Sequence, residues 1–134
     1  MQHPLTLIAT LGTATAALGA CAPAAEVSEG RGQPVYEGVQ VTPLADDLVS
    51  LTVAMRGPAG RTEVEAYGRC ATAQYALDRG YGFARQVRTI VRREGRSWVG
   101  DAVYLISPGQ PQGLRTIDAA VAVAECAELG IPTV

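Results

Sequence analysis

The sequence predicts a small α+β fold, a single domain in which two helices pack on one face of an antiparallel sheet. Three patterns predict this class. Apolar and polar residues alternate from Asp47 to Met55, as they do in a half-buried strand. A turn at 93–96 joins two further apolar segments into a hairpin. Two segments, beginning at Thr62 and Thr116, carry the capping and stop residues of helices. The expected order is therefore β-α-β-β-α.

The two helices are expected at residues 62–79 and 116–130. Thr62-Glu63-Val64-Glu65 matches a capping box, and Gly80 and Gly130 supply the stops. Thr116 is expected to cap the second helix. One face of the first helix carries small and apolar residues and should lie against the sheet: Ala66, Cys70, Ala73 and Leu77. The expected buried face of the second helix is Ala119, Ala120, Val123 and Ala127, with Cys126 on its flank.

The strands are expected at 39–41, 47–55, 81–92 and 97–106, the first of them as a short edge strand. Four residues of the third strand should share one face: Tyr81, Phe83, Val87 and Val91. In the last strand, Trp98, Tyr104 and Ile106 alternate on one face and are interpreted as packing residues. Asp101 lies on the opposite face, where an arginine of a neighbouring strand is its expected partner.

The N-terminal segment has the character of an export signal. Residues 5–20 are an uncharged stretch, short for a spanning helix and loosely apolar. The stretch ends in Leu18-Gly19-Ala20-Cys21, which resembles the bacterial lipobox. The resemblance implies that the Cys21 thiol receives a diacylglyceryl group, that signal peptidase II cuts before Cys21, and that the new amine is acylated, for example with palmitate. The alternative is an uncleaved buried helix with an incidental cysteine.

This interpretation divides the chain into a lipoprotein signal peptide (1–20), a flexible tether (21–38) and the α+β domain (39–134). Acylated Cys21 would hold the domain on membrane lipid in the bacterial envelope. In the enterobacterial sorting rule, Asp directly after the acylated cysteine keeps a lipoprotein in the inner membrane. This chain has Ala22 at that position, which favours the outer membrane, with the domain facing the periplasm. Residues 1–4 contain no Lys or Arg, so either the α-amine supplies the positive charge of the signal or the true start lies upstream.

Composition excludes several classes of function. The 134 residues are 48% hydrophobic and 18% charged, which is typical of a globular domain. A net charge of −2 argues against a general nucleic-acid binder. The single histidine, His3, lies in the expected signal peptide. The mature chain would therefore lack an imidazole for Ser-His-Asp or Cys-His catalysis or for a histidine-containing zinc site. We expect no cofactor and no metal.

Cys70 and Cys126 are the two cysteines that remain once Cys21 is acylated. In an oxidising compartment such a pair is naturally interpreted as a disulfide. The alternative is two buried free thiols that act as small apolar residues. A catalytic redox pair is disfavoured, because neither cysteine belongs to a C-x-x-C motif.

Five arginines cluster in the hairpin 85–96, namely Arg85, Arg88, Arg92, Arg93 and Arg96. Arg88 and Arg92 should share a face, with Arg85 on the other. One hypothesis is an anion-binding surface, formed by Arg88, Arg92, Arg93 and Arg96, for lipid phosphate, lipopolysaccharide or an acidic cell-wall polymer. The favoured alternative is a solvated sheet face with a charged edge that blocks aggregation.

Tyr67-Gly68-Arg69-Cys70-Ala71, Leu77 and Gly80-Tyr81-Gly82-Phe83 together resemble a family of small uncharacterised alphaproteobacterial lipoproteins. The resemblance implies an envelope lipoprotein and carries no activity or catalytic residue. The expected function is therefore a non-enzymatic module of the envelope, anchored by Cys21. A cell-wall- or anion-binding module is the first alternative, and an enzyme of unknown class is the second.

Overall fold

The computed structural model describes residues 32–134. The expected signal peptide, Cys21 and the tether as far as residue 31 lie outside this part of the chain. The described residues form β1 (Val35–Pro43), β2 (Leu48–Arg56), α1 (Arg61–Asp78), β3 (Phe83–Glu94), β4 (Ser97–Ser107), β5 (Thr116–Asp118) and α2 (Ala119–Leu129). The α+β class is confirmed.

The predicted order of elements is incomplete, because the sheet has five strands and the order is β-β-α-β-β-β-α. The strands lie in the order β1-β2-β4-β3-β5, with every neighbouring pair antiparallel. β1 begins at Val35, so residues 35–38 belong to the domain and not to the tether. Tyr36 packs edge-on against Tyr67 of α1, with 4.8 Å between the ring centroids. β5 has three residues, too few to show a period of two.

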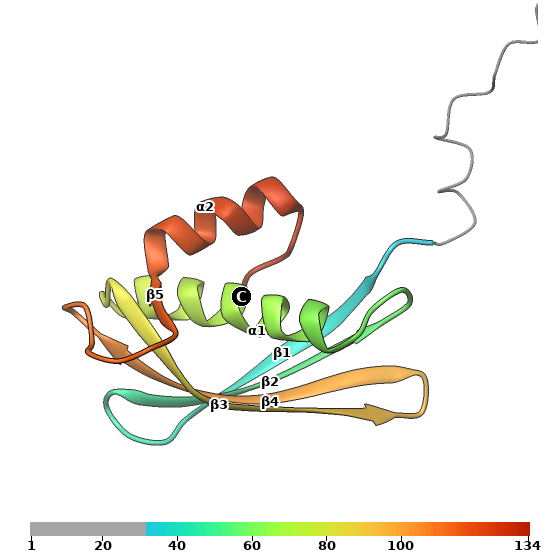
Figure 1. Cartoon of the computed structure of the whole chain (residues 1–134), viewed down its shortest axis with the longest axis horizontal. Helices are drawn as coiled ribbons and strands as arrows, with labels where there is room; N and C mark the ends of the chain where they lie inside the picture. Colours follow the sequence, from blue (N-terminus) through green and yellow to red (C-terminus); the bar gives the residue numbers. More distant parts are fainter. Residues whose placement is uncertain (1–31) are drawn as a thin grey trace, which may run out of the picture. The chain divides into compact units, whose positions relative to one another are not determined.

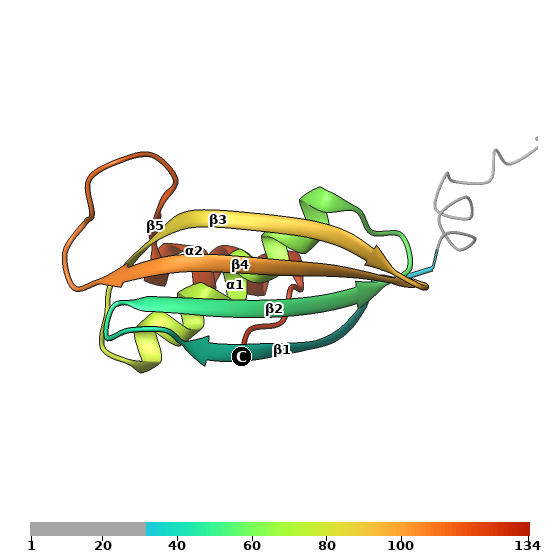
Figure 2. The same cartoon turned by 90° about the horizontal axis from the view of Figure 1, so that it is seen from below.

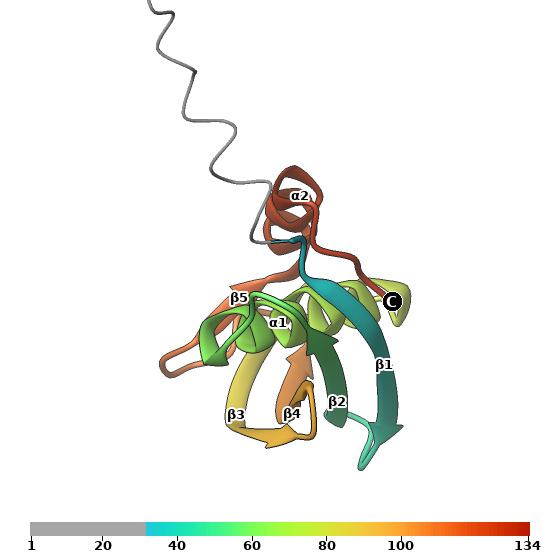
Figure 3. The same ribbon diagram turned by 90° about the vertical axis from the view of Figure 1, so that its right-hand side faces the viewer.

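Both helices lie on the same side of the sheet, as Figure 1 shows, but only α1 covers the sheet itself. α2 packs on α1 and on β5 and forms a further layer. Seen from the end of the molecule, the sheet curves beneath α1 (Figure 3). Within residues 32–134 the opposite face of the sheet carries no helix, and its strands stand in front of both helices in Figure 2; we call it the helix-free face. Both helices thus lie on one face of the sheet, with α2 in contact with the sheet at β5 and otherwise packed on α1.

The contact between α1 and the sheet depends on small residues at its centre. A Cβ at Gly100 of β4 would lie 2.5 Å from the Cγ1 atom of Val64, and one at Gly68 would lie 4.0 Å from the Cβ of Ala102. The face of α1 that was expected to lie on the sheet includes Cys70, which is instead bonded to α2. Both sides of α1 are covered, so its burial does not follow a single amphipathic stripe.

The starts of both helices also differ from the prediction. Gly60 is the N-cap of α1, and its N–H donates to the Glu63 carboxylate at 2.8 Å, so Thr62 lies inside the helix. Asp118 caps α2 by accepting from the N–H of Val121 at 3.2 Å, whereas Thr116 belongs to β5. The inward residues of α2 are Ala119, Ala122 and Cys126. The predicted stops are confirmed, with Gly80 at φ +81° and Gly130 at φ +69°.

A bulge in β3 overturns the predicted sharing of faces. The register with β4 shifts between Gln86 and Arg88, so Val87 is the extra residue. Arg85 and Arg88 consequently pair with Leu105 and Val103 on the same, helix-free face. The arrangement predicted for Arg85, on the face opposite Arg88, is therefore wrong. Within residues 32–134, neither helix is both long and apolar enough to cross a bilayer.

Candidate functional site

Cys70 and Cys126 form a disulfide that joins the middle of α1 to α2, with 6.0 Å between their Cα atoms. Both residues are 1% exposed. On the surface beside this bond, Arg69 of α1 pairs with Glu125 of α2 at 3.0 Å. The predicted pairing is therefore confirmed, and the disulfide is a structural brace between two helices.

The arginines of the hairpin do not converge on one point. Arg92 pairs with Asp101 and, at 2.9 Å, with Glu94. Arg93 lies on the other side of the sheet, with its guanidinium carbon 4.8 Å from the centroid of Trp98. Arg96 lies in the turn. Arg88 forms no ion pair within residues 32–134. The charge available to an anion on the helix-free face is therefore lower than the sequence suggests.

Asp101 has the cross-strand partner that was expected for it. Thr52 donates to one carboxylate oxygen at 2.8 Å, and Arg92 donates to the other. Burial alone would raise the pKa of Asp101, but the hydrogen bonds from Thr52 and Arg92 together hold this pKa below its usual value. Asp101 is therefore an ionised partner in a surface network, without the second catalytic group that a reaction would need.

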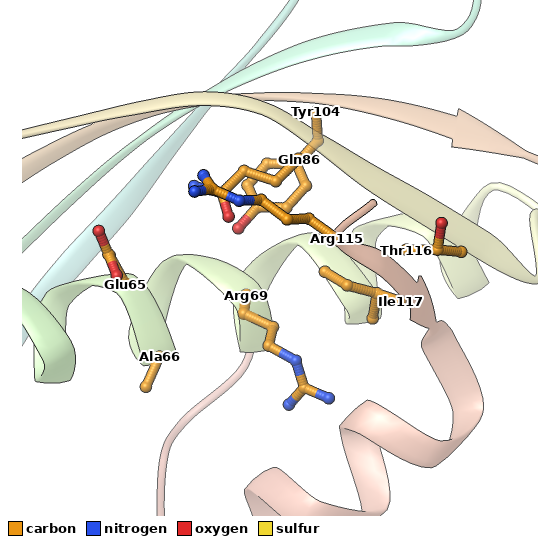
Figure 4. Close-up of a pocket in the computed structure, with 8 residues that line it drawn as sticks. All are labelled: Glu65, Ala66, Arg69, Gln86, Tyr104, Arg115, Thr116 and Ile117. Atoms are coloured by element: carbon orange, nitrogen blue, oxygen red, sulfur yellow. The ribbon is translucent and has the colours of Figure 1, made fainter. Parts of the chain in front are cut away.

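A cavity of about 260 Å³ lies between α1, β3, β4 and the segment that enters β5. Its lining combines charged, polar and apolar side chains: Glu65, Ala66, Arg69, Gln86, Tyr104, Arg115, Thr116 and Ile117. In Figure 4 the Arg115 side chain extends toward Gln86 and the Tyr104 hydroxyl, whereas the Arg69 guanidinium points away toward α2. Arg115 is thus the cation that the fold leaves for this cavity.

Tyr104 brings a hydroxyl group to this cavity. The residue as a whole is 2% exposed, and no group in residues 32–134 is hydrogen-bonded to its hydroxyl, which reaches the open space of the cavity. The one fully buried side-chain atom without a partner in these residues is the Nε atom of Arg85, which lies against Gly113 and outside this cavity. Burial raises the pKa of Tyr104 to about 12, Glu65 adds to this rise, and the guanidinium groups of Arg69 and Arg115 oppose it. The phenol therefore stays protonated at neutral pH and can act as a hydrogen-bond donor.

Arg115 has a strained backbone. Its φ of +62° makes it the only non-glycine residue with positive φ in the described part of the chain. Its carbonyl accepts from the N–H of Gln86 at 3.2 Å, and the hydroxyl of Thr116 lies 3.3 Å from the carbonyl oxygens of Pro111 and Gly113. Such backbone strain typically costs about 1 kcal/mol or more and is concentrated at functional sites.

A second cavity, of about 410 Å³, lies at the other end of α1, lined by Pro43, Ala45, Asp46, Tyr75, Arg79, Tyr81 and Ile106. Its cation, Arg79, stacks on Tyr75 with 4.9 Å from its guanidinium carbon to the ring centroid. No cluster of three or more metal-ligating side chains occurs in residues 32–134. We therefore treat the cavity at Tyr104 and Arg115 as the candidate site.

Comparison with known proteins places the domain in a family. The model of the family described as the YNQ4 C-terminal domain matches residues 36–130. The chain belongs to this family. It is also 35% identical over 104 residues to an uncharacterised 26.9 kDa protein encoded in the nqo8 5′ region of Paracoccus denitrificans, an alignment that covers 72% of this chain. No solved structure matches.

Membership of the YNQ4 C-terminal domain family confirms the predicted resemblance to an uncharacterised alphaproteobacterial family. The chain spans 40% of the length of the Paracoccus relative. The matched range covers α1, where the segment 67–71 lies, and the glycine stop that precedes β3.

Sequence reasoning interpreted Tyr104 as packing and assigned no site role to Glu65, Gln86 or Arg115. A tyrosine that alternates with aliphatic residues on one face of a strand has the pattern of a core residue. Only the structure shows that its hydroxyl faces a cavity without a protein partner. Nothing in the residues around Arg115 marks its positive φ, because the neighbouring Gly113 is the residue to which a sequence pattern would assign one, and Gly113 does have a φ of +111°.

Proposed function

We propose that this chain is a non-enzymatic envelope lipoprotein, anchored through acylated Cys21 and presenting its α+β domain outside the cytoplasm. The Cys70–Cys126 disulfide is the observation that supports the proposal most directly. Disulfides persist in oxidising compartments and are rare in the bacterial cytoplasm. Leu18-Gly19-Ala20-Cys21 supplies an independent reason for export, through its resemblance to a lipobox.

The roles of the cysteines are consistent with this assignment. Both half-cystines of the disulfide are buried, and the stabilisation it brings is available only where thiols are oxidised. Cys21 is the remaining cysteine and stands at the lipobox position, so its thiol is available for acylation. Residues 22–34 separate it from β1 and provide a spacer between bilayer and domain.

Intact-mass measurement on the chain purified from membranes of its bacterium tests this proposal. We expect a polypeptide that begins at Cys21 and carries the mass of two or three acyl chains, gaining two hydrogens when reduced. The matched control is the Cys21→Ser variant, which should carry no lipid mass. A wild-type chain that begins at Met1 with no added lipid would contradict the proposal.

A second candidate function is binding of an anionic surface by the helix-free face of β3. The bulge places Arg85 beside Arg88 there, and Val87 and Ile90 are 50% and 49% exposed. Arginines among exposed apolar side chains suit an anionic lipid surface. Sedimentation of the full chain with phosphatidylglycerol vesicles would show weaker binding for Arg88→Ala than for Arg61→Ala, a matched loss of charge on α1. Equal binding by both variants would dismiss this candidate.

A further inference from the structure

We propose that the cavity lined by Tyr104 and Arg115 is a binding site for a small carboxylate ligand. The inference goes beyond the envelope role, because it concerns what the domain recognises and holds whether or not Cys21 is acylated. It depends on three features of the described residues: a tyrosine hydroxyl that faces the cavity without a protein partner, an arginine without a carboxylate, and a strained backbone that presents this arginine.

The hydroxyl of Tyr104 is the first feature. A tyrosine hydroxyl that faces a cavity and has no protein partner is free to donate a hydrogen bond to a ligand. Tyr104 is 2% exposed, forms no hydrogen bond within residues 32–134, and points into the cavity in Figure 4. A ligand oxygen in the cavity could therefore accept a hydrogen bond from this hydroxyl.

The second feature is that only one of the two guanidinium groups lining the cavity is paired with a carboxylate. Arg69 is committed to Glu125 at 3.0 Å. Arg115 forms no ion pair within residues 32–134, and its charge lies near enough to the Tyr104 phenol to oppose the rise that burial causes in the pKa of that phenol. A guanidinium presents paired N–H donors in a plane, which matches the two oxygens of a carboxylate.

The third feature is the way Arg115 is held. A residue with φ of +62° persists only where its surroundings hold it in place. Here the backbone of Arg115 bonds to β3, and Thr116 bonds back to the loop before it. Arginine therefore occupies a position that a glycine would adopt without strain, which indicates that its side chain has a use there.

The electrostatics of the cavity favour a monoanion. Its available charge is one guanidinium, joined by the neutral hydroxyl donor of Tyr104, whereas the Gln86 amide already donates to the Thr89 hydroxyl at 2.5 Å. Glu65 lines the same cavity and would repel the second charge of a phosphate dianion. A volume of about 260 Å³ lies at the small end of ligand pockets. The ligand class that fits is a small monocarboxylate.

Nuclear magnetic resonance titration of the ¹⁵N-labelled full chain tests the proposal, with acetate as the probe and phosphate and methylammonium as comparisons. We expect saturable shifts at the amides of residues 65–69, 86, 104 and 115–117, with a Kd on the order of 1–10 mM for so small a ligand. Phosphate should bind more weakly at neutral pH, and methylammonium should leave these amides unchanged.

Two variants and a control complete the design. Arg115→Gly accepts the positive φ, removes the guanidinium, and should weaken acetate binding about tenfold or more. Tyr104→Phe keeps the ring and should also weaken binding, by about threefold or more, because the hydroxyl donor is lost. Arg96→Gln removes the same charge from the hairpin turn and should leave binding unchanged.

Three results would overturn the inference. The first is the absence of saturable shifts at the cavity with wild-type chain in about 100 mM acetate, well above the expected Kd. The second is equal weakening by Arg115→Gly and Arg96→Gln, which would indicate general charge attraction. The third is unchanged binding by Tyr104→Phe, which retains the Tyr104 ring and so keeps the test informative if Arg115→Gly fails to fold. Any of these three results would leave the lipid-anchor proposal intact, because the intact-mass measurement tests that proposal separately.

Discussion

Removal of the disulfide should cost the domain a large part of its stability. The bond spans 56 residues, and the chain-entropy model gives about 4 kcal/mol for closing a loop of that length. A domain of this size typically has a free energy of unfolding of about 5–15 kcal/mol. The inward residues of α2 other than Cys126 are alanines, which bury little apolar area against α1, so the covalent link carries much of its attachment.

The perturbation is the double variant Cys70→Ala with Cys126→Ala, compared with the intact chain in a Cys21→Ser background so that no free thiol remains. Urea unfolding, followed by Trp98 fluorescence and by far-UV circular dichroism, reports the free energy of unfolding. We expect a loss of about 4 kcal/mol, with α2 signals lost first if unfolding ceases to be two-state.

Chemical reduction supplies the matched control for this experiment. The chain treated with reductant should unfold at the same urea concentration as the double variant, because both lack the cross-link and keep small side chains at the two positions. A loss below about 1 kcal/mol in both cases would refute the loop-closure reasoning. It would mean that packing alone fixes α2 on α1.

Three further predictions concern packing and charge. Gly100→Ala should destabilise the domain by about 1–3 kcal/mol, since its Cβ would overlap Val64, whereas Gly109→Ala, with open space around it, should stay within about 0.5 kcal/mol in thermal unfolding. Asp101→Asn should cost less than about 1 kcal/mol at pH 7; because the folded pKa is lowered, urea titrations should show this difference vanish as the pH falls through that pKa. Tyr104, whose folded pKa is raised to about 12, should lower stability as the pH rises from about 10 toward 12, and Tyr104→Phe should reduce that loss in alkaline unfolding curves; a remainder is expected from Tyr67, whose pKa burial also raises. These expectations would be contradicted by a sharp destabilisation in Gly109→Ala, by an Asp101→Asn effect that is unchanged in acid, or by an alkaline loss of the same size in Tyr104→Phe as in the wild-type chain, respectively.

The elements that sequence patterns predict well are those whose signal is local. The alternation from Asp47 to Met55 reappears in β2, and the stops at Gly80 and Gly130 end both helices at positive φ. The pairing of Cys70 with Cys126 follows from the count of cysteines and the expected compartment. In each case a short stretch of chain, or a single chemical type, carries the information.

The features that escaped prediction depend on tertiary contacts. The bulge at Val87 is defined by the register with β4 and has no marker in the residues of β3 itself. α2 stacks on α1 because α1 is buried on two sides. Small residues such as Ala73 allow a second helix to approach, but they do not indicate in the sequence which element will do so. The candidate cavity joins residues from four separate segments, and the role of Tyr104 emerges only from its missing hydrogen bond.

Trapping of thiols in living cells tests most directly whether the domain works outside the cytoplasm with its disulfide closed. Cells of the native bacterium are quenched in acid, and the chain is treated with a bulky maleimide before and after reduction. We expect Cys70 and Cys126 to react only after reduction in the wild-type chain, whereas both should react at once in a variant that lacks residues 2–20 and stays in the cytoplasm. Immediate labelling of both cysteines in the wild-type chain would contradict it.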